Sequence, residues 1–239
     1  MQQYFVEQKG NMNEVIAFTQ EQQHHIAHVL RMKQGSVVRI VDNEGCAYLA
    51  TISYVHQQPI ATIFEEIENT EHRDIILVAA LIKKEKWEYV LQKAAELGAT
   101  KIIPLETSRT VVKSNDEKVD RKLARWNKIV LEACEQSHHT YCTEVVEPIR
   151  IKDLPIYLVD VNLVAYEKEN VSKHIKHYVK GLKNVLVIIG PEGGFDPKEI
   201  DTLLEMGVQP CSLGKNILRA ETAGLYALTV IDAMSEEEL

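Results

Sequence analysis

Two glycine-bearing segments in the last third of the chain have the composition of ligand-binding loops. Residues 190–194 contain three glycines and follow the apolar run 185–189, and Gly214 follows the apolar run 208–213. Glycine lets backbone N–H and C=O groups approach a ligand closely, and the carboxyl ends of strands are where open α/β sheets bind ligands. Both segments are therefore candidate ligand loops, although a tight structural turn explains the glycines about as well.

The spacing of the glycines argues against two common nucleotide-binding loops. A phosphate-binding P-loop has the pattern Gly-x-x-x-x-Gly-Lys-Ser/Thr, and a dinucleotide-binding loop has Gly-x-Gly-x-x-Gly. Gly190, Gly193 and Gly194 fit neither pattern. ATP and NAD are therefore disfavoured as ligands.

Each candidate loop leads into a predicted helix that begins with charged residues. Asp196 suits the N-cap of the first helix, Pro197 its first position, and Glu199 completes a capping box. Glu221 falls in the first turn of the last helix, where the helix dipole favours an acidic residue. Arg219 has apolar neighbours beside a candidate ligand loop, so its guanidinium requires a partner, either an internal carboxylate or a bound molecule.

The elements that position these residues fall into two parts, joined by the polar residues 70–74. Residues 1–70 hold a helical pattern at 20–32 and three β-rich stretches, for which a small β-barrel is the economical interpretation. From residue 75 onward, short apolar runs alternate with amphipathic helical patterns, which is typical of a parallel α/β sheet covered on both faces. The β-rich stretches are 37–41, 48–55 and 60–67; the apolar runs are 75–82, 101–105, 156–161, 185–189 and 208–213; the helical patterns are 87–97, 119–136, 171–179, 197–206 and 221–233.

The 239 residues have the composition of a globular protein, with 45% hydrophobic and 26% charged side chains. No apolar run is long enough to span a membrane, and the first residues lack the basic and apolar regions of a secretory signal. Four scattered cysteines without a Cys-x-x-Cys pair indicate a reducing compartment. We therefore expect a cytoplasmic protein without membrane segments.

The formal net charge of −8 is unfavourable for binding nucleic acid, because phosphate binding depends on positive potential. Half of the basic side chains lie in residues 71–150, but acidic side chains are interleaved with them. From charge alone, solvated helix faces are a better interpretation than a nucleic-acid-binding face.

A metal site and aromatic stacking are two further interpretations that the residues permit. Cys134, His138, His139 and Cys142 are close in the sequence, but their spacing is not that of a standard zinc module, and we expect no metal. The two tryptophans, at positions 87 and 126, fall in helical apolar patterns and are most simply core residues.

The two loop segments also carry a resemblance to a known family. Gly190-Pro-Glu-Gly-Gly-Phe, followed by Leu213-Gly-Lys-Asn-Ile-Leu-Arg-Ala-Glu-Thr-Ala, resembles the C-terminal signature of the SPOUT methyltransferases. More narrowly, the chain is similar over its whole length to the bacterial 16S ribosomal RNA uridine N3-methyltransferase family. The upstream segments that carry this likeness are 25–31, 86–98, 108–110, 125–126 and 132–137.

This resemblance implies a fold, a cofactor and a quaternary structure. We expect an α/β protein with a PUA-like RNA-binding barrel over residues 1–70 and a SPOUT domain with a deep trefoil knot over residues 75–239. The family is normally a homodimer with the active site near the subunit interface, and it binds S-adenosylmethionine between three knot loops. Carried over to this sequence, the cofactor-binding residues are Leu158, Ile189, Gly190, Glu192, Gly193, Gly194, Leu213, Gly214, Ile217 and Leu218.

The implied acceptor, N3 of a uridine in 16S rRNA within the small ribosomal subunit, sets the chemistry. N3 carries a proton that must be lost for methylation, and negative charge then develops on the base. The expected catalytic residues are Arg219, to stabilise that charge, and Glu221, to orient the polar network or accept the proton; Glu192 is expected to have a structural role. The expected RNA contacts are Arg31, Lys93, Arg109 and Lys113.

Two other functions stay open at this point. The chain departs from the family pattern at His138, His139 and Cys142, which bears on RNA affinity and substrate choice. One alternative is a non-catalytic RNA-binding or ribosome-assembly protein with a degenerate knot. The other is a SPOUT methyltransferase that acts on a different RNA.

Overall fold

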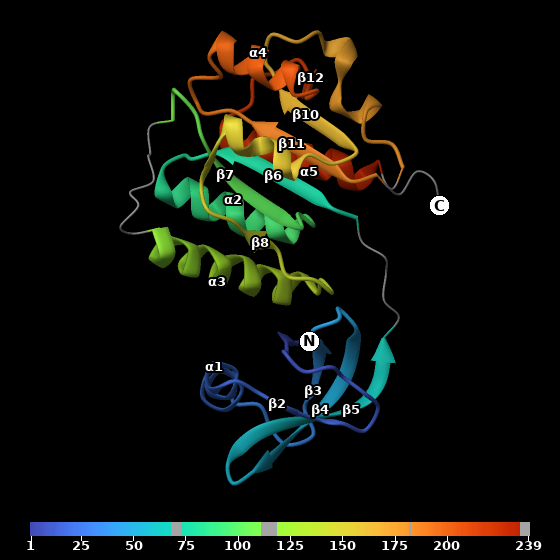
Figure 1. The fold of residues 1–239 in the computed structure, drawn as a ribbon. Helices are drawn as coiled ribbons and strands as arrows, with labels where there is room; N and C mark the ends of the chain where they lie inside the picture. The colour runs from blue at the N-terminus through green and yellow to red at the C-terminus, as the bar shows by residue number, and fades with distance from the viewer. Residues whose placement is uncertain (68–72, 111–118, 182, 235–239) are drawn as a thin grey trace. The chain divides into compact units, whose positions relative to one another are not determined.

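The computed structural model describes residues 1–67, 73–110, 119–181 and 183–234 (Figure 1). Contacts within the chain divide it into two units: residues 1–71 with 134–142, and residues 72–133 with 143–239. Each unit has its own sheet and its own apolar core. The sequence patterns did not predict that residues 134–142 belong with the N-terminal unit.

The first unit is built on a five-stranded, mostly antiparallel sheet in which β1 runs parallel to β3. Alternate side chains such as Ile40, Ile52 and Ile63 are fully buried, which is the period-two pattern of a sheet with one covered face. A register shift between Leu49 and Ala50 is a bulge, a feature that bends and twists a sheet. In sheet order the strands are β1 (Gln3–Phe5), β3 (Val37–Val41), β4 (Ala47–Val55), β5 (Gln58–Ile67) and β2 (Val15–Ala17).

The predicted helix at 20–32 is shorter in the structure. α1 (Gln20–His24) starts at Thr19, where a capping box joins Thr19 and Gln22: each side chain accepts a hydrogen bond from the other's backbone N–H. A π-helical turn, η1 (His25–Val29), continues α1. The chain leaves the helix at Arg31, which has a φ of 50°.

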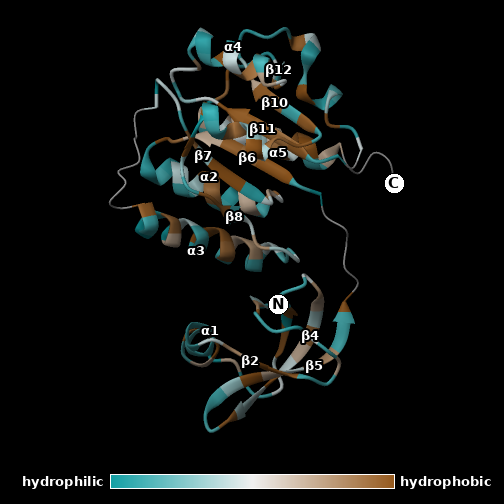
Figure 2. Ribbon diagram, viewed as in Figure 1, coloured by the Kyte–Doolittle hydropathy of each residue, from teal (hydrophilic) through white to brown (hydrophobic). Residues whose placement is uncertain are grey.

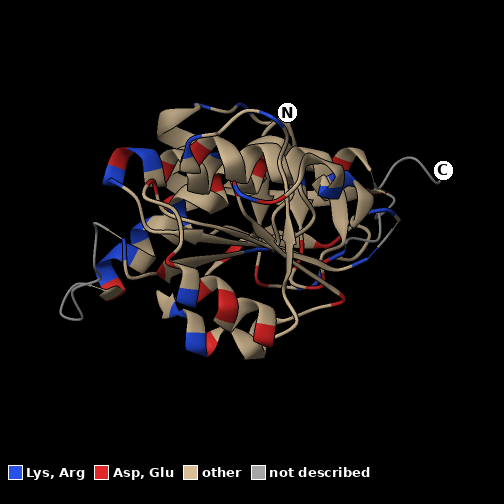
Figure 3. Ribbon diagram, turned by 90° about the horizontal axis from the view of Figure 1, so that it is seen from above, with Lys and Arg blue, Asp and Glu red and all other residues tan. Residues whose placement is uncertain are grey.

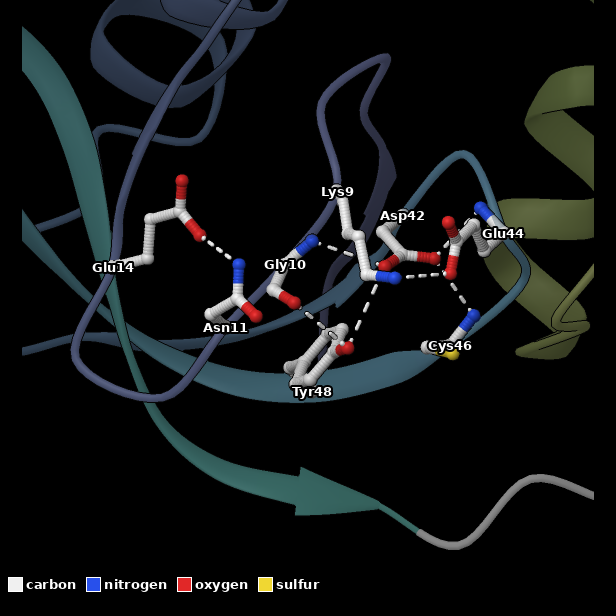
Figure 4. A network of polar contacts seen from close by, with 8 residues as sticks. All are labelled: Lys9, Gly10, Asn11, Glu14, Asp42, Glu44, Cys46 and Tyr48. Atoms are coloured by element: carbon white, nitrogen blue, oxygen red, sulfur yellow. Dashed lines mark hydrogen bonds and ion pairs between the residues drawn. The ribbon is translucent and has the colours of Figure 1, made fainter.

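A buried carboxylate fixes the N-terminal segment to this sheet (Figure 4). Asp42, only 4% exposed, accepts hydrogen bonds from the backbone N–H groups of Gly10 at 3.0 Å, Glu44 at 2.9 Å and Cys46 at 2.8 Å. The Tyr48 hydroxyl donates to the Gly10 carbonyl at 3.1 Å and lies 3.5 Å from Asp42 Oδ2. One carboxylate therefore joins the turn after β3 to the loop between β1 and β2.

The second unit is built on a parallel sheet with the strand order β12-β10-β11-β6-β7-β8, in which β9 also pairs with β7. The central strands β6 and β11 are apolar throughout and buried at every position, and most of the sheet is brown in Figure 2. The strands are β6 (Ile75–Ala80), β7 (Lys101–Glu106), β8 (Glu144–Val145), β9 (Ile149–Arg150), β10 (Val161–Ala165), β11 (Val185–Ile189) and β12 (Gln209–Cys211).

Helices and turns cover both faces of this sheet, which explains the continuous apolar runs. On one face, Ile76, Val78, Leu186 and Ile188 belong to a core that includes residues of α4 and of the 3-10 turn η3. On the other face, α5 approaches so closely that a Cβ on Gly224 would contact Leu77 at 3.6 Å. The predicted parallel sheet with two covered faces is confirmed.

Four longer helices follow the predicted patterns to within a few residues. They are α2 (Lys84–Glu96), α3 (Val119–Ser137), α4 (Pro197–Glu205) and α5 (Ala220–Ala233). α4 begins as predicted: Asp196 is the N-cap, Pro197 opens the helix and Glu199 completes the capping box. Trp87 and Trp126 are buried and meet edge to face with ring centroids 5.7 Å apart, so both are core residues.

The predicted strand at 156–161 is wrong. Most of this apolar run belongs to the 3-10 helix η3 (Ile151–Tyr157) and the turn that follows it, and the strand β10 begins only at Val161. Asp153 accepts a hydrogen bond from the backbone N–H of Arg150 at 3.2 Å, and Pro155 cannot donate to a strand ladder. Local capping and proline therefore override the apolar pattern.

The predicted helix at 171–179 is also wrong. Two short 3-10 turns, η4 (Val171–Lys173) and η5 (Ile175–His177), replace it. The Asn170 side chain accepts from Ser172 N at 2.9 Å, and His174 accepts from Lys176 N at 3.3 Å. Each polar side chain caps a new turn, so the helix does not propagate.

Charged residues of both signs lie side by side on the helices and loops, as Figure 3 shows. The strands are largely free of charge in that view. Over the ranges that the structure describes, no helix has the length and apolar content needed to cross a membrane.

Candidate active site

A cavity of about 670 Å³ lies at the carboxyl ends of three neighbouring parallel strands of the second unit. Its walls are formed by residues 165–167 after β10, 189–195 after β11, and 212–220 after β12, together with Ala223 of α5. This is the edge of a parallel sheet at which ligands bind, and the volume suits a small organic ligand. The two glycine-bearing segments therefore meet in one pocket.

Nine of the ten residues predicted to bind the cofactor line this cavity, and Leu158 does not. Leu158 follows η3 and packs against the apolar core on the face of the sheet that α4 and η3 cover. Because the strand was misplaced, its carboxyl end was misplaced as well, and the third wall of the cavity is Ala165, Tyr166 and Glu167. Had the strand been placed at 161–165, the loop after it would have been found.

The glycines are required by space and by backbone conformation. A Cβ on Gly190 would lie 2.8 Å from the buried Phe195 ring, so even alanine is excluded there without movement of the ring. Gly194 and Gly214 have φ values of 67° and 124°, which L-residues rarely adopt. These loops hold their shape without side chains in the way of a ligand.

Arg109 braces the first glycine loop from outside. Its Nη1 donates to the Gly193 carbonyl at 2.9 Å and to the Phe195 carbonyl at 3.4 Å, and Nη2 lies 3.5 Å from Asp196 Oδ2. The guanidinium predicted to contact RNA is thus engaged with the loop itself.

Lys86 of α2 ties the first glycine loop, on the cavity wall, to the start of α5. Its Nζ lies 2.8 Å from Glu192 Oε1 in the first loop and 2.9 Å from Glu221 Oε1 at the start of α5. Hydrogen bonds to Glu192 and Glu221 raise the pKa of Lys86. Burial is the largest single effect on Glu221 and opposes its charged form. The hydrogen bonds from Lys86 and from the backbone, together with the positive charges of Lys86 and Arg219, outweigh burial and lower the pKa of Glu221. Both groups are therefore ionised at neutral pH.

The sequence analysis missed this cluster, because Lys86 is distant in the sequence from both carboxylates. The second oxygen of Glu221, Oε2, is buried without a hydrogen-bond partner within the described ranges. An ionised carboxylate with one buried, unsatisfied oxygen has capacity for one more donor. Glu221 does not itself line the cavity, whereas its neighbours Ala220 and Ala223 do.

Arg219 lines the cavity and is exposed. It occupies the N-cap position of α5, yet its side chain makes no capping hydrogen bond. No hydrogen bond or ion pair of the guanidinium is present among the residues that the structure describes. The sequence allowed two kinds of partner for Arg219. No internal carboxylate among the described residues is in hydrogen-bonding position, so a bound molecule is the partner that remains.

The residues expected to contact RNA are distributed over both units. Lys93 pairs with Glu96 one turn along α2, at 2.7 Å, and Arg109 braces the glycine loop. Arg31 is exposed in the first unit, and Lys113 lies outside the described residues.

The cysteines and histidines near residue 140 do not form a metal site in the described part of the chain, where no cluster of three potential ligands occurs. A hydrogen bond with Cys134 raises the pKa of the Cys142 thiol. His138 and His139 instead contact the N-terminal strand region: the His139 carbonyl accepts from Gln3 Nε2 at 2.7 Å.

Comparison with known proteins places these two units in one class. Residues 69–232 match the family model of the RNA methyltransferase domain, and residues 18–60 match that of the RNA methyltransferase PUA domain. The pocket is formed by loops at the strand ends of a parallel α/β sheet, and a PUA domain precedes it in the chain. Together with the family models, these features define the class as RNA methyltransferases.

Individual relatives narrow the class. The chain is 34% identical to ribosomal RNA small subunit methyltransferase E of Bacillus subtilis, over 99% of this chain and 98% of the relative. It is 32% identical to the protein of the same name from Mesomycoplasma hyopneumoniae, over 96% and 98% of the two chains. The chain belongs to the ribosomal RNA small subunit methyltransferase E family.

Solved structures agree over nearly the full length. A methyltransferase from Legionella pneumophila in complex with SAM has a TM-score of 0.86 at 31% identity, covering 98% of this chain and 97% of that one. Ribosomal RNA small subunit methyltransferase E from Neisseria gonorrhoeae, bound to S-adenosyl methionine, has a TM-score of 0.87 at 25% identity, covering 98% of both chains. The expected fold class, a PUA-like N-terminal domain and a SPOUT α/β domain, is confirmed.

Proposed function

We propose that this protein uses S-adenosylmethionine to methylate N3 of a uridine in the 16S rRNA of the small ribosomal subunit. The observation that carries the proposal is the pocket formed by three loops at strand ends, with the Arg219 guanidinium on its wall. Among the described residues, this guanidinium has no hydrogen-bond or ion-pair partner. Family membership supports an RNA methyltransferase of the small ribosomal subunit, and the uridine and its N3 atom are our own inference.

The cavity suits S-adenosylmethionine by size and by charge. A volume of about 670 Å³ lies within the range of sites for ligands of this size. The charged residues on its wall are Glu167, Glu192, Lys215 and Arg219, a balanced set that fits a ligand without phosphate. When bound, the cofactor supplies an electrophilic methyl group. The backbone of the loops around Gly190 and Gly214 would hold its adenosine, because glycine leaves N–H and C=O groups accessible.

Arg219 is the group placed to act on the acceptor base. The N3 lone pair of uracil is delocalised while the proton is present, so the proton must leave before or during methylation. Negative charge then spreads over the carbonyl oxygens, and a guanidinium with free N–H donors stabilises it. Arg219 is exposed at the cavity and makes no hydrogen bond or ion pair with the described side chains.

Glu221 acts better as a positioning residue than as the proton acceptor. Its lowered pKa makes it a weak base. Its carboxylate is held by Lys86 and lies two residues from Arg219 at the start of α5. The negative charge of Glu221 therefore orients Arg219 electrostatically, while Lys86 fixes the start of α5 against the loop that carries Glu192.

The proposed active form is a homodimer in the cytoplasm. Apolar side chains stand exposed on and beside the pocket loops: Ile217 is 87% exposed and Tyr226 of α5 is 37% exposed. A second copy of the chain covering these groups would remove apolar surface from water next to the active site. Light scattering at several protein concentrations tests this part of the proposal, and a monomer at all concentrations contradicts it.

Methyl transfer to small-subunit RNA is the direct test. Purified protein, labelled cofactor and small ribosomal particles lacking the modification are incubated, and the RNA is digested to nucleosides for mass spectrometry. We expect 3-methyluridine at one position. A ribose-methylated product, or label only in transfer RNA or large-subunit RNA, would show that the chain acts on another site.

The role of Arg219 is tested in the same assay with Arg219→Ala. We expect a fall in kcat of roughly a hundredfold or more, the range for loss of a donor to a developing oxyanion, with cofactor affinity nearly unchanged. Arg121→Ala removes another exposed arginine, on α3, and should behave as wild type. Wild-type turnover by Arg219→Ala would remove Arg219 from the mechanism.

Calorimetry separates the enzyme from a non-catalytic RNA-binding protein. We expect saturable heat on titration with S-adenosylmethionine. Absence of heat, with RNA binding intact, would support the non-catalytic alternative.

A further inference from the structure

A second cavity, of about 450 Å³, lies in the same unit and is not part of the cofactor pocket. Its walls come from the carboxyl end of β7, the start of η3 and the first turns of α4. Three basic residues contribute to its lining: Arg150, Lys152 and Lys198. We call this cavity the basic groove.

The three cations are exposed and available. Within the described ranges, neither the Arg150 guanidinium nor the ammonium groups of Lys152 and Lys198 take part in an ion pair. The lysines of α2 behave differently: Lys84, Lys86 and Lys93 each pair with a glutamate. Cations that converge on a groove without carboxylate partners are suited to an anionic ligand.

Two carboxylates also line the groove, and one of them is satisfied by backbone donors. Glu199 accepts from Ser108 N at 2.7 Å through Oε1 and from Asp196 N at 2.9 Å through Oε2. Its carboxylate thus fixes the start of α4, and Glu106 is the other acidic residue on the wall. Three cations against these two carboxylates give the groove a local positive balance in a chain whose formal net charge is −8.

The groove and the cofactor pocket share a wall. Ser108 lines the groove, while its neighbour Arg109 donates to the Gly193 and Phe195 carbonyls at the pocket. Asp196 and Glu199 likewise connect the glycine loop to the groove through the start of α4. A strand of nucleic acid that presents a base to the pocket would carry its backbone along this wall.

We propose that the basic groove binds backbone phosphates of the RNA substrate beside the nucleotide that enters the pocket. This inference rests on the proposed function, because it takes the acceptor to be RNA. Arginine and lysine side chains bind phosphate oxygens without reading sequence, so the groove positions the RNA and does not select the base.

Filter binding of deproteinised 16S rRNA, without cofactor, tests the groove independently of catalysis. The triple variant Arg150→Gln, Lys152→Gln, Lys198→Gln should bind about tenfold to a hundredfold more weakly, and the slope of log affinity against log salt should fall by about one for each phosphate that is no longer neutralised. The matched control, Lys176→Gln, Lys180→Gln, Lys183→Gln, removes three exposed lysines of the same unit and the same total charge. It should stay within about twofold of wild type.

A charge-preserving variant guards against a folding artefact. Arg150→Lys, Lys152→Arg, Lys198→Arg keeps three cations in the groove and should retain most of the affinity and the salt slope. Equal binding by the groove variant and its control would overturn the groove. Loss of binding to ribosomal particles, with binding to naked RNA intact, would also overturn it, because the partner would then be a protein. Wild-type protein that binds RNA but does not methylate it would instead count against the proposed activity alone.

Discussion

Lys86 and Glu221 form an ion pair at 2.9 Å that joins α2 to the first turn of α5, and the same ammonium group reaches Glu192 in the glycine loop at 2.8 Å. The contact between Lys86 and Glu192 spans 106 positions of the sequence. One side chain therefore ties the first glycine loop, which lines the cavity, to the start of α5 beside it.

Replacing Lys86 by methionine should change how stability depends on pH. The pKa of Glu221 is lowered in the folded protein, so its contribution is present above the unfolded-state pKa of about 4.3 and is lost as the pH falls through the folded value. In Lys86→Met, the pKa of Glu221 rises and this contribution shrinks. Thermal unfolding of the wild type and the variant from about pH 3 to pH 7 measures this difference in the pH dependence of stability.

A second substitution tests whether the ion pair causes this change in stability at acidic pH. Glu221→Gln is introduced both into the wild-type protein and into Lys86→Met, and the pH dependence of unfolding is compared between the two. If the difference caused by methionine at position 86 disappears in the Glu221→Gln background, the pair is its source. An unchanged difference would assign it elsewhere.

Arg109→Ala should affect the cofactor more than the RNA. Because the guanidinium donates to two carbonyls of the glycine loop, its removal leaves the loop less ordered. We expect cofactor affinity to fall roughly tenfold, equivalent to about 1.4 kcal/mol, and RNA affinity to change little. Calorimetry and filter binding on one preparation give both values. The reverse pattern would restore the RNA-contact role that the resemblance implied.

Gly190→Ala should deform the pocket by overpacking. The new Cβ would meet the Phe195 ring at 2.8 Å, and inserting a methyl group into a packed site typically costs about 1–3 kcal/mol of unfolding free energy. Chemical denaturation measures that cost, and calorimetry measures the loss of cofactor binding. The double variant Gly190→Ala, Phe195→Leu has room for the methyl group and should recover part of the unfolding free energy and part of the cofactor affinity. Without any recovery, the contact with Phe195 is not the cause.

Asp42→Ala should destabilise the first unit and leave the cofactor pocket intact. It leaves the backbone N–H groups of Gly10, Glu44 and Cys46 without their acceptor, and the buried Gly10 group alone costs about 1–3 kcal/mol when unsatisfied. Asp42→Asn keeps one acceptor oxygen and should be milder. Hydrogen exchange of these three amides reports the change locally. Equal exchange in both variants and wild type would show that the carboxylate is dispensable.

Local sequence patterns were sufficient for most elements. The apolar run at 185–189 predicts a strand buried on both faces, and β11 is one. Asp196, Pro197 and Glu199 predict the start of α4, because capping involves only residues within one turn. Local patterns failed where local competition was strong: Pro155 and Asp153 redirected the run before β10, and with it the expected place of the third loop.

The sequence by itself determined the covered parallel sheet, the two glycine loops and, through a whole-chain resemblance, the family of the protein. These depend on periodicity, capping and motif spacing, which neighbouring residues encode. Only the tertiary structure decided that Lys86 joins Glu192 to Glu221, that Arg109 braces Gly193 across 84 positions, and that residues 165–167 close the pocket. Such contacts depend on how packed helices and strands are ordered in space, and side-chain spacing along the chain does not record that order.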